Sequence, residues 1–216
     1  LDREKLADST LVLFFSDNGG VTGFTDNRPL RGSKGTLYDG GVRVPLIVRW
    51  PGHAPAGQTS DARVCSIDFL PTFAALAGAA APQGLDGVDI TAALSGGPAP
   101  ARDALYWHYP HYHVEKPSGA ILQGDWKLIE WFETGKTELF NVTADPDEAK
   151  DLAAENPAQT AALLAGLKAW RTRVGAQMPT PNPAYDPARA DEGPAKEKKP
   201  KKEKPKKINP AKEHRQ

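Results

Sequence analysis

The sequence has little cysteine, no long apolar run and no excess of charge of either sign. Its one cysteine, Cys65, excludes an internal disulfide and a cysteine-rich metal site. No stretch approaches the roughly 18 consecutive apolar residues that a membrane-spanning helix needs. The 27 Lys and Arg residues balance the 27 Asp and Glu residues, so a globally basic nucleic-acid-binding protein is not indicated. The 216 residues are enough for one large domain or two small ones.

The chain begins with Leu1 rather than Met, and its first residues contain no signal peptide. Residues 1–7 are typical of the last turns of a helix that leads into a strand. We therefore expect a preceding segment to be missing, and the absence of a signal peptide then carries no information about compartment.

Residues 1–103 alternate strand and helix patterns, which is typical of an α/β sheet. The short apolar run 11–15 predicts a strand buried on both faces, as in a parallel sheet, and 44–50 predicts a second strand. Residues 66–78 predict a helix with a polar cap at its start and Gly78 at its end. One face of this helix would carry Ile67, Leu70, Phe73, Leu76 and Ala77.

The pattern changes after residue 103, and residues 104–174 predict an antiparallel meander followed by a helix. The expected strands are the short apolar runs 104–109, 120–122, 126–132 and 138–142, which turn signals separate. The helix begins at Asn156-Pro157, and we expect it to cover one face of the small sheet. Its apolar stripe consists of Leu163, Leu164, Leu167, Trp170 and Val174.

Residues 175–216 form a Pro- and Lys-rich tail that cannot bury a core, so we expect it to be disordered. The run 196–207 contains no apolar residue. Its positive charge would allow contact with anionic polymers such as sulfated glycans, although two glutamates dilute it. We expect no specific nucleic-acid binding.

Polar residues that can bind a metal ion follow the first strand directly, in the stretch Ser16-Asp17-Asn18-Gly19. Ligands of open α/β sheets bind at the carboxyl ends of the strands. The carboxylate of Asp17 and the amide oxygen of Asn18 suit a hard divalent cation such as Ca²⁺ or Mg²⁺. The alternative is a plain turn in which Asn18 or a glycine adopts the left-handed conformation.

A lysine between two glycines follows, in Arg31-Gly32-Ser33-Lys34-Gly35. Lys34 is accessible and able to face an oxyanion. The GxxxxGK[ST] spacing of a nucleotide-binding loop is absent. Alone, such a lysine is more often a solvated surface charge.

These motifs occur in the order found in one enzyme family. TLVLFFSDNGG followed by NRPLRGSKGTLYDGGVRVPLIVRWPG, and later SIDFLPTFAALAG, YWHYPHY and AILQGDWKLIEW, resemble the type I sulfatases of the alkaline-phosphatase superfamily. The resemblance runs from residue 1 to about 174. It implies the C-terminal part of an alkaline-phosphatase-like α/β sheet domain (1–103), then a small antiparallel sheet packed with a C-terminal helix (104–174).

The resemblance also implies roles for individual residues. Asp17 and Asn18 correspond to two of the family's calcium ligands, with Mg²⁺ less expected than Ca²⁺. Lys34 corresponds to the lysine that contacts the substrate's sulfate group. Asp39 stands where the family more often has Glu and is expected to be structural, and Arg43 belongs to the loop scaffold.

The family's nucleophile is a formylglycine made from Cys or Ser in a C/S-x-P-x-R motif, and no such motif occurs here. Cys65 lies in CSIDF and is interpreted as a small core residue. We therefore expect the formylglycine in the missing N-terminal part, and we expect this chain alone to be inactive.

The histidines of YWHYPHYH invite a metal interpretation, but their spacing does not place all three on one face, so zinc is not expected. His108 and His111 are candidates for lining a sugar subsite. The alternative is that the aromatic residues pack in the small sheet and leave the histidines partly exposed. Trp126, Trp131 and Trp170 are assigned to the core.

Three functions remain open from the sequence. The leading one is hydrolysis of sulfate esters, on carbohydrates because the C-terminal part is rich in aromatic residues. The alternatives are a phosphatase or phosphonate hydrolase of the same superfamily, and a catalytically inactive glycan-binding relative. The resemblance implies a periplasmic or extracellular location.

Overall fold

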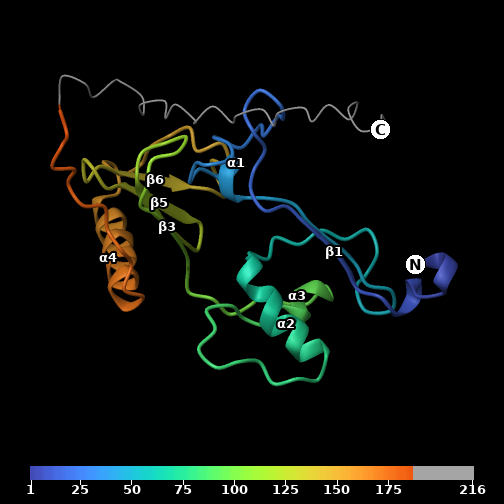
Figure 1. The fold of residues 1–216 in the computed structure, drawn as a ribbon. Coiled ribbons are helices and arrows are strands. Elements are labelled where there is room, and N and C mark those ends of the chain that lie inside the picture. The colour runs from blue at the N-terminus through green and yellow to red at the C-terminus, as the bar shows by residue number, and fades with distance from the viewer. Residues whose placement is uncertain (187–216) are drawn as a thin grey trace, which may run out of the picture. The chain divides into compact units, whose positions relative to one another are not determined.

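The computed structural model describes residues 1–186, and the contacts discussed below lie within the compact unit Leu1–Pro179 (Figure 1). Disorder is predicted for the tail 175–216, of which residues 187–216 lie outside the described residues. None of the helices in residues 1–186 combines the length and the apolar character needed to cross a bilayer.

The first sheet has two strands, β1 (Val12–Phe15) and β2 (Leu46–Arg49), after two short 3₁₀ turns at Asp2–Glu4 and Ala7–Ser9. Both strands lie where the sequence predicts them. The expected parallel pairing is wrong, because the chain between them folds back and the two strands run antiparallel, with Phe14 opposite Ile47. Burial on both faces is also wrong, because the Phe14 side chain is 59% exposed and the Ile47 side chain is 61% exposed.

The other face of this ladder packs on two helices that close a small core. A 3₁₀ turn, Ser66–Asp68, leads into α2 (Phe69–Leu76), and α3 (Thr91–Leu94) follows. The cluster contains Leu13, Leu46 and Val48 from the strands, Phe69 from α2, and the buried Ile90, Ala93 and Leu94. Phe15 adds an edge-to-face contact with Phe69 at 5.0 Å between ring centroids. Helices and ladder therefore form one core here.

Asp68 fixes the start of α2 from a fully buried position. Its carboxylate accepts the backbone N–H groups of Cys65 (2.7 Å) and Val88 (3.0 Å), and it pairs with Arg102. The polar cap predicted for the start of the helix is thus present as a capping box formed by Cys65 and Asp68. Cys65 is half-buried at this cap and belongs to none of the three apolar clusters of the described residues, so its assignment to the core is wrong.

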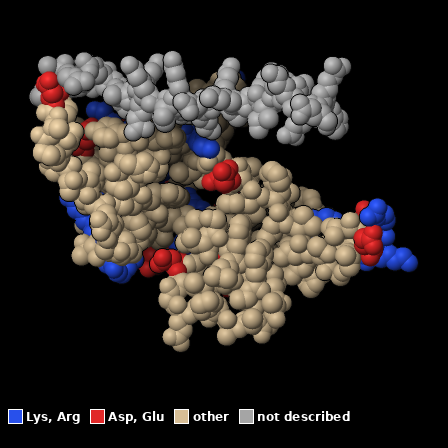
Figure 2. All heavy atoms as spheres, viewed as in Figure 1, with Lys and Arg blue, Asp and Glu red and all other residues tan. Residues whose placement is uncertain are grey.

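The apolar face predicted for α2 is exposed in this structure. Ile67, Leu70, Phe73 and Leu76 are all among the exposed large apolar side chains. Figure 2 shows that the surface in the region of α2 and α3 carries few charged side chains. The helix packs instead through Phe69 and the buried Thr72, whose hydroxyl accepts the N–H of Ile90 at 3.1 Å.

The second sheet is the predicted antiparallel meander. Its strands are β3 (Leu105–Tyr109), β4 (Ser118–Gln123), β5 (Trp126–Trp131) and β6 (Thr137–Asn141), in the order β3-β4-β5-β6. Each neighbouring pair is antiparallel. The chain therefore reverses direction at 123–125 and at 133–136, as the turn signals predict.

Different parts of the chain cover the two faces of this sheet. On one face α4 (Pro157–Arg173) buries Leu163 and Leu167 against Ile121, Leu128 and Leu139, as predicted. On the other face, Leu37 and Tyr38, which immediately precede the short helix α1 (Asp39–Val42), pack on Ala120, Ile129 and Phe140. Figure 1 shows α1 next to β6. The segment between β1 and β2, which contains Lys34, is thereby attached to the C-terminal sheet.

Candidate functional site

The turn after β1 presents Asp17 and Asn18 at the end of the strand. The N–H of Asn18 donates to Asp17 Oδ1 at 3.0 Å, and the Ser16 hydroxyl donates to the Asn18 carbonyl at 2.9 Å. Asp17 is exposed and Asn18 is half-buried. Neither Asn18 nor Gly19 has a positive φ, so the left-handed turn considered as an alternative is not formed.

The glycines of this turn are needed for close packing. Gly19 donates its N–H to the Gly41 carbonyl at 2.9 Å, and a Cβ atom at position 19 would overlap the backbone carbonyl of Gly40. Only glycine allows two backbone segments to approach this closely. The turn and the start of α1 are thereby held together.

The same packing brings the backbone of Lys34 to the turn. The N–H of Lys34 donates to the Gly20 carbonyl at 3.1 Å, and Gly40 donates to Arg31 O at 2.7 Å. The Lys34 side chain is exposed, and it forms no ion pair with any residue in the described range 1–186. Its ammonium group is therefore available to an anion.

Asp17 and Asn18 offer oxygen atoms that suit Ca²⁺. Asp17 Oδ2 accepts no hydrogen bond within the described residues, and the Asn18 side-chain nitrogen donates to Gly19 O at 3.0 Å, so the amide oxygen remains free of donors there. Ca²⁺ takes six to eight oxygen ligands. Residues 1–186 contain no group of three or more His, Cys, Asp or Glu side chains placed for a metal, and the two side chains of this turn are fewer ligands than Ca²⁺ requires.

The structure separates the two histidines predicted to line a sugar subsite. His108 lies on β3, and its Nε2 atom is 2.7 Å from the Gln177 carbonyl, while its ring packs near Phe132. His111 is exposed after the strand, with its ring centroid 4.1 Å from that of Tyr109. No contact with the Lys34 loop is formed by either histidine within the described residues.

The third histidine of the same segment does contact the Lys34 loop. His113 lies so close to Gly35 that a side chain at position 35 would overlap its imidazole ring. The N–H of His113 donates to the Glu115 carbonyl at 3.1 Å, and its ring lies near Tyr109. His113 is thus the histidine of YWHYPHYH that contacts the loop carrying the predicted catalytic lysine.

A buried cluster of charges fixes α1 on the C-terminal sheet. Lys127 of β5 is fully buried, and its Nζ lies 2.7 Å from Asp39 Oδ1 and 2.9 Å from Glu148 Oε1. Glu148 also accepts the N–H of Asp39 at 2.7 Å through Oε2. Burial raises the pKa of Glu148, although Lys127 opposes this shift. The structural role predicted for Asp39 is confirmed.

Arg31 extends this attachment toward the sheet. Its guanidinium group donates to the Glu148 carbonyl at 2.9 Å and lies over the Tyr38 ring at 3.8 Å. The Tyr38 hydroxyl donates to Glu138 at 2.6 Å. Arg43 pairs with Asp39 at 3.8 Å, in agreement with its predicted scaffold role.

Sequence reasoning missed Lys127 and Glu148. A signal for Lys127 was present, because strand alternation places it on the same face as Ile129 and Trp131, where a charged residue needs a buried partner. Nothing local marks Glu148, which adopts a φ of 49° in the loop after β6. Only the fold shows that it meets Lys127.

The model of the family described as "N-sulphoglucosamine sulphohydrolase, C-terminal" matches residues 32–173. The chain belongs to the sulfatase family. Membership confirms the resemblance seen in the motifs, and the matched range includes Lys34, the buried charge cluster and all of α4. Asp17 and Asn18 precede the matched range.

Individual sulfatases support the same assignment. A sulfatase of Formosa agariphila is 40% identical over 185 residues, which are 76% of this chain and 33% of that protein. An N-acetylglucosamine-6-O-sulfatase of Bacteroides thetaiotaomicron is 34% identical over 155 residues, 67% of this chain and 26% of the relative. The chain therefore spans about a third of the length of the curated relatives it matches.

Solved structures show the same fold. The crystal structure of Ps i-CgsB in complex with k-i-k-neocarrahexaose superimposes with a TM-score of 0.70 at 33% identity, and covers 79% of this chain and 38% of that one. The α/β fold class, in its alkaline-phosphatase-like form with an antiparallel sheet and a C-terminal helix, is thus confirmed.

Proposed function

We propose that this chain forms the C-terminal part of an enzyme that hydrolyses sulfate esters of carbohydrates. Asp17 and Asn18 supply oxygen ligands to Ca²⁺, and Lys34 binds the sulfate group. The observation that carries the proposal is the hydrogen bond from Lys34 N to Gly20 O, 3.1 Å, which holds the backbone of Lys34 beside the turn of the two oxygen donors. The Lys34 side chain has no ion-pair partner among residues 1–186. We refer below to the polypeptide that contains both this chain and the nucleophile as the full-length enzyme.

Lys34 contributes by electrostatic stabilisation. Hydrolysis of a sulfate ester breaks an S–O bond, and negative charge develops on the oxygens around sulfur. An ammonium group that is already positioned there stabilises that charge more than the ground state. Asp17 and Asn18 would hold Ca²⁺ through their side-chain oxygens, and the bound ion would supply further positive charge and Lewis acidity.

The nucleophile lies outside this chain in our proposal. A formylglycine made from Cys or Ser requires the C/S-x-P-x-R motif, and the 216 residues contain none. We therefore place it in a preceding segment of the full-length enzyme. This chain alone is then expected to have no sulfatase activity.

Carbohydrate sulfates are the proposed substrates, with export to the periplasm or the cell exterior. One relative is an N-acetylglucosamine-6-O-sulfatase, and a structural neighbour binds a neocarrahexaose. The exposed His111 beside Tyr109 is suited to contact a sugar at the rim of the site. The contact of His108 with Gln177 makes that histidine a weaker candidate, and its role in binding remains a prediction.

Calcium dependence tests the proposed ligands. In the full-length enzyme, removal of metal with a chelator should abolish sulfate release, and Ca²⁺ should restore it. Asp17→Ala should raise the Ca²⁺ concentration for half-maximal recovery at least about tenfold, because loss of a charged ligand weakens binding. The measurement is sulfate release against free Ca²⁺, together with metal content after dialysis.

Asp61→Ala is the matched control, since Asp61 is an exposed aspartate that forms no hydrogen bond or ion pair with the turn in the described part of the chain. It should leave the Ca²⁺ curve unchanged. An Asp17→Ala enzyme with the wild-type Ca²⁺ curve and metal content would overturn the assignment of this ligand.

A further inference from the structure

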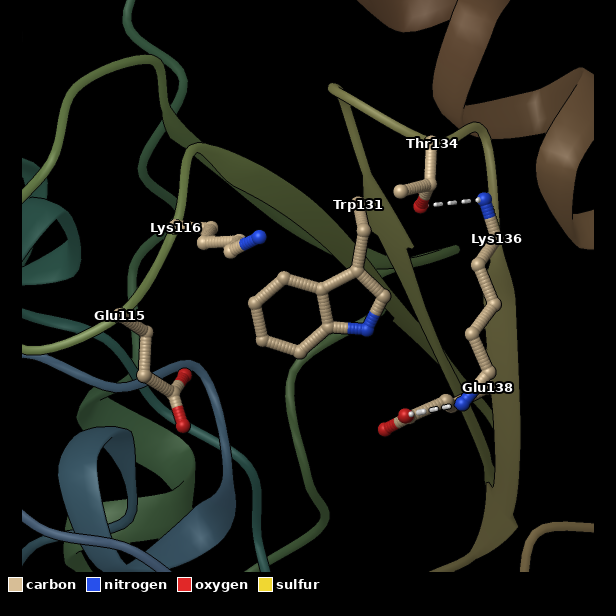
Figure 3. Close-up of a pocket in the computed structure, with 6 residues that line it drawn as sticks. All are labelled: Glu115, Lys116, Trp131, Thr134, Lys136 and Glu138. Carbon is tan, nitrogen blue, oxygen red and sulfur yellow. Dashed lines mark hydrogen bonds and ion pairs between the residues drawn. The ribbon is translucent and has the colours of Figure 1, made fainter. Parts of the chain in front are cut away.

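A hollow of about 350 Å³ lies on the C-terminal sheet, outside the turn and loop described above. It is lined by Glu115, Lys116, Trp131, Thr134, Lys136 and Glu138. Figure 3 shows the Trp131 indole ring at its centre, between the side chains of Lys116 and Lys136. Trp131, which the sequence assigns to the core, packs against the buried cluster that contains Tyr38 and Phe140, but it is only half-buried and also borders this hollow.

The charged residues of the hollow are held in place by their neighbours. Lys136 Nζ pairs with Glu138 Oε1 at 2.9 Å, and the other oxygen of Glu138 accepts the Tyr38 hydroxyl at 2.6 Å. Lys116 pairs with Glu133 at 3.3 Å. Because each lysine faces a carboxylate, the hollow has donors and acceptors but no excess of positive charge. An isolated anion is therefore not its natural ligand.

Glu115 provides an unused acceptor. Its Oε2 atom is buried and accepts no hydrogen bond from any residue in the described part of the chain. Burial raises the pKa of this carboxyl, and the nearby Arg31 opposes the rise. A buried carboxylate oxygen without a donor is costly, so a ligand hydroxyl that donates to it would be favoured.

The hollow is linked to the Lys34 loop by a short segment. The Glu115 carbonyl accepts the N–H of His113, and the His113 ring lies against Gly35, the neighbour of Lys34. Residues 113–115 therefore join the hollow to the loop that carries Lys34. A half-buried aromatic ring with fixed polar groups around it suits a sugar ring, which has an apolar C–H face and hydroxyls on its edge.

We propose that this hollow binds the sugar unit next to the sulfated one in an oligosaccharide substrate. The C–H face of that sugar packs on Trp131, one hydroxyl donates to Glu115, and the lysines donate to others. The choice of a sugar as ligand rests on the proposed function. With this second sugar site, the enzyme would prefer an oligosaccharide to a single sulfated sugar.

The test compares two substrates of the full-length enzyme, N-acetylglucosamine 6-sulfate and a disaccharide that ends in the same sulfated unit. The wild type should have a kcat/KM for the disaccharide at least about tenfold above that for the monosaccharide, the effect of one or two good contacts. Glu115→Gln and Trp131→Phe should each lower this ratio toward one. Lys150→Ala, which removes an exposed lysine paired with Glu155, should leave the ratio unchanged.

An unchanged ratio in both variants would overturn the inference while the proposed function stands. If the full-length enzyme acts on neither sugar, calorimetric titration of the 216-residue chain with the unsulfated disaccharide decides the matter. Binding that weakens about tenfold in Glu115→Gln and Trp131→Phe supports the site. No binding, or equal binding by all variants, contradicts it.

Discussion

Replacing Lys34 by alanine in the full-length enzyme is expected to lower kcat for sulfate ester hydrolysis about 100- to 1,000-fold, the usual effect of removing one positioned group that stabilises developing charge. The side chain is exposed and forms no ion pair with any described residue, so its loss removes little packing. Stability should change by less than about 0.5 kcal/mol, as for other surface substitutions. Steady-state kinetics and a urea unfolding curve measure the two effects.

Two further variants are compared with Lys34→Ala, one that keeps the charge at position 34 and one that removes an exposed lysine elsewhere. Lys34→Arg keeps the charge but changes its shape and reach, so it should recover only part of the lost activity. Lys168→Ala removes an exposed lysine of α4 and should retain wild-type kcat. A Lys34→Ala enzyme with normal turnover would remove this residue from the proposed site.

Replacing Lys127 by methionine is expected to destabilise the chain by about 3–5 kcal/mol, because it leaves two buried carboxylates without their cation. Asp39 and Glu148 lie 2.7 Å and 2.9 Å from the Lys127 ammonium, and the backbone N–H of Asp39 donates to Glu148 Oε2. The loss should also loosen α1 and, through it, the turn at Gly19. Urea unfolding of the 216-residue chain measures the change.

The matched control is Lys150→Met, which removes the same charge from an exposed pair with Glu155. It should cost less than about 1 kcal/mol, since exposed ion pairs contribute little. Adding Glu148→Gln to Lys127→Met should restore part of the stability because it removes one unpaired charge. Equal, small losses in Lys127→Met and Lys150→Met would show that the buried cluster does not hold α1 in place.

The destabilisation by Lys127→Met should depend on pH. Burial raises the pKa of Glu148 above its ordinary value of 4.5, and Lys127 is the main group that lowers it. A carboxyl whose folded pKa is raised favours folding below its unfolded pKa, and this contribution is lost as the pH rises through the folded value. Without Lys127 the folded pKa rises further, so the loss of stability should be larger at pH 8 than at pH 5.

The C-terminal sheet and its helix were predictable because local signals agree with the tertiary fold. Alternating apolar residues and turn signals at 123–125 and 133–136 fix the meander. The stripe that includes Leu163 and Leu167 fixes the face of α4 that is buried. Each signal lies within the element that it determines, so no knowledge of distant contacts was needed.

The N-terminal part was less predictable because its environment depends on segments distant in sequence. An apolar run such as β1 indicates a strand but not the direction of its partner, and the face of α2 with Leu70 and Phe73 is exposed despite its apolar pattern. In the candidate site, Asp17, Asn18 and Lys34 could be named from their motifs. Only the structure shows that Gly20 accepts the backbone N–H of Lys34, and that Gly19 donates its own N–H to Gly41 at the end of the same loop.

The central claim is that this chain serves the hydrolysis of sulfate esters rather than phosphate esters. The most direct measurement compares sulfate release from N-acetylglucosamine 6-sulfate with phosphate release from N-acetylglucosamine 6-phosphate by the full-length enzyme. We expect faster release of sulfate than of phosphate, and a large loss of sulfate release in Lys34→Ala. Release of phosphate alone, or binding of the sulfated sugar without release of sulfate, would contradict this claim.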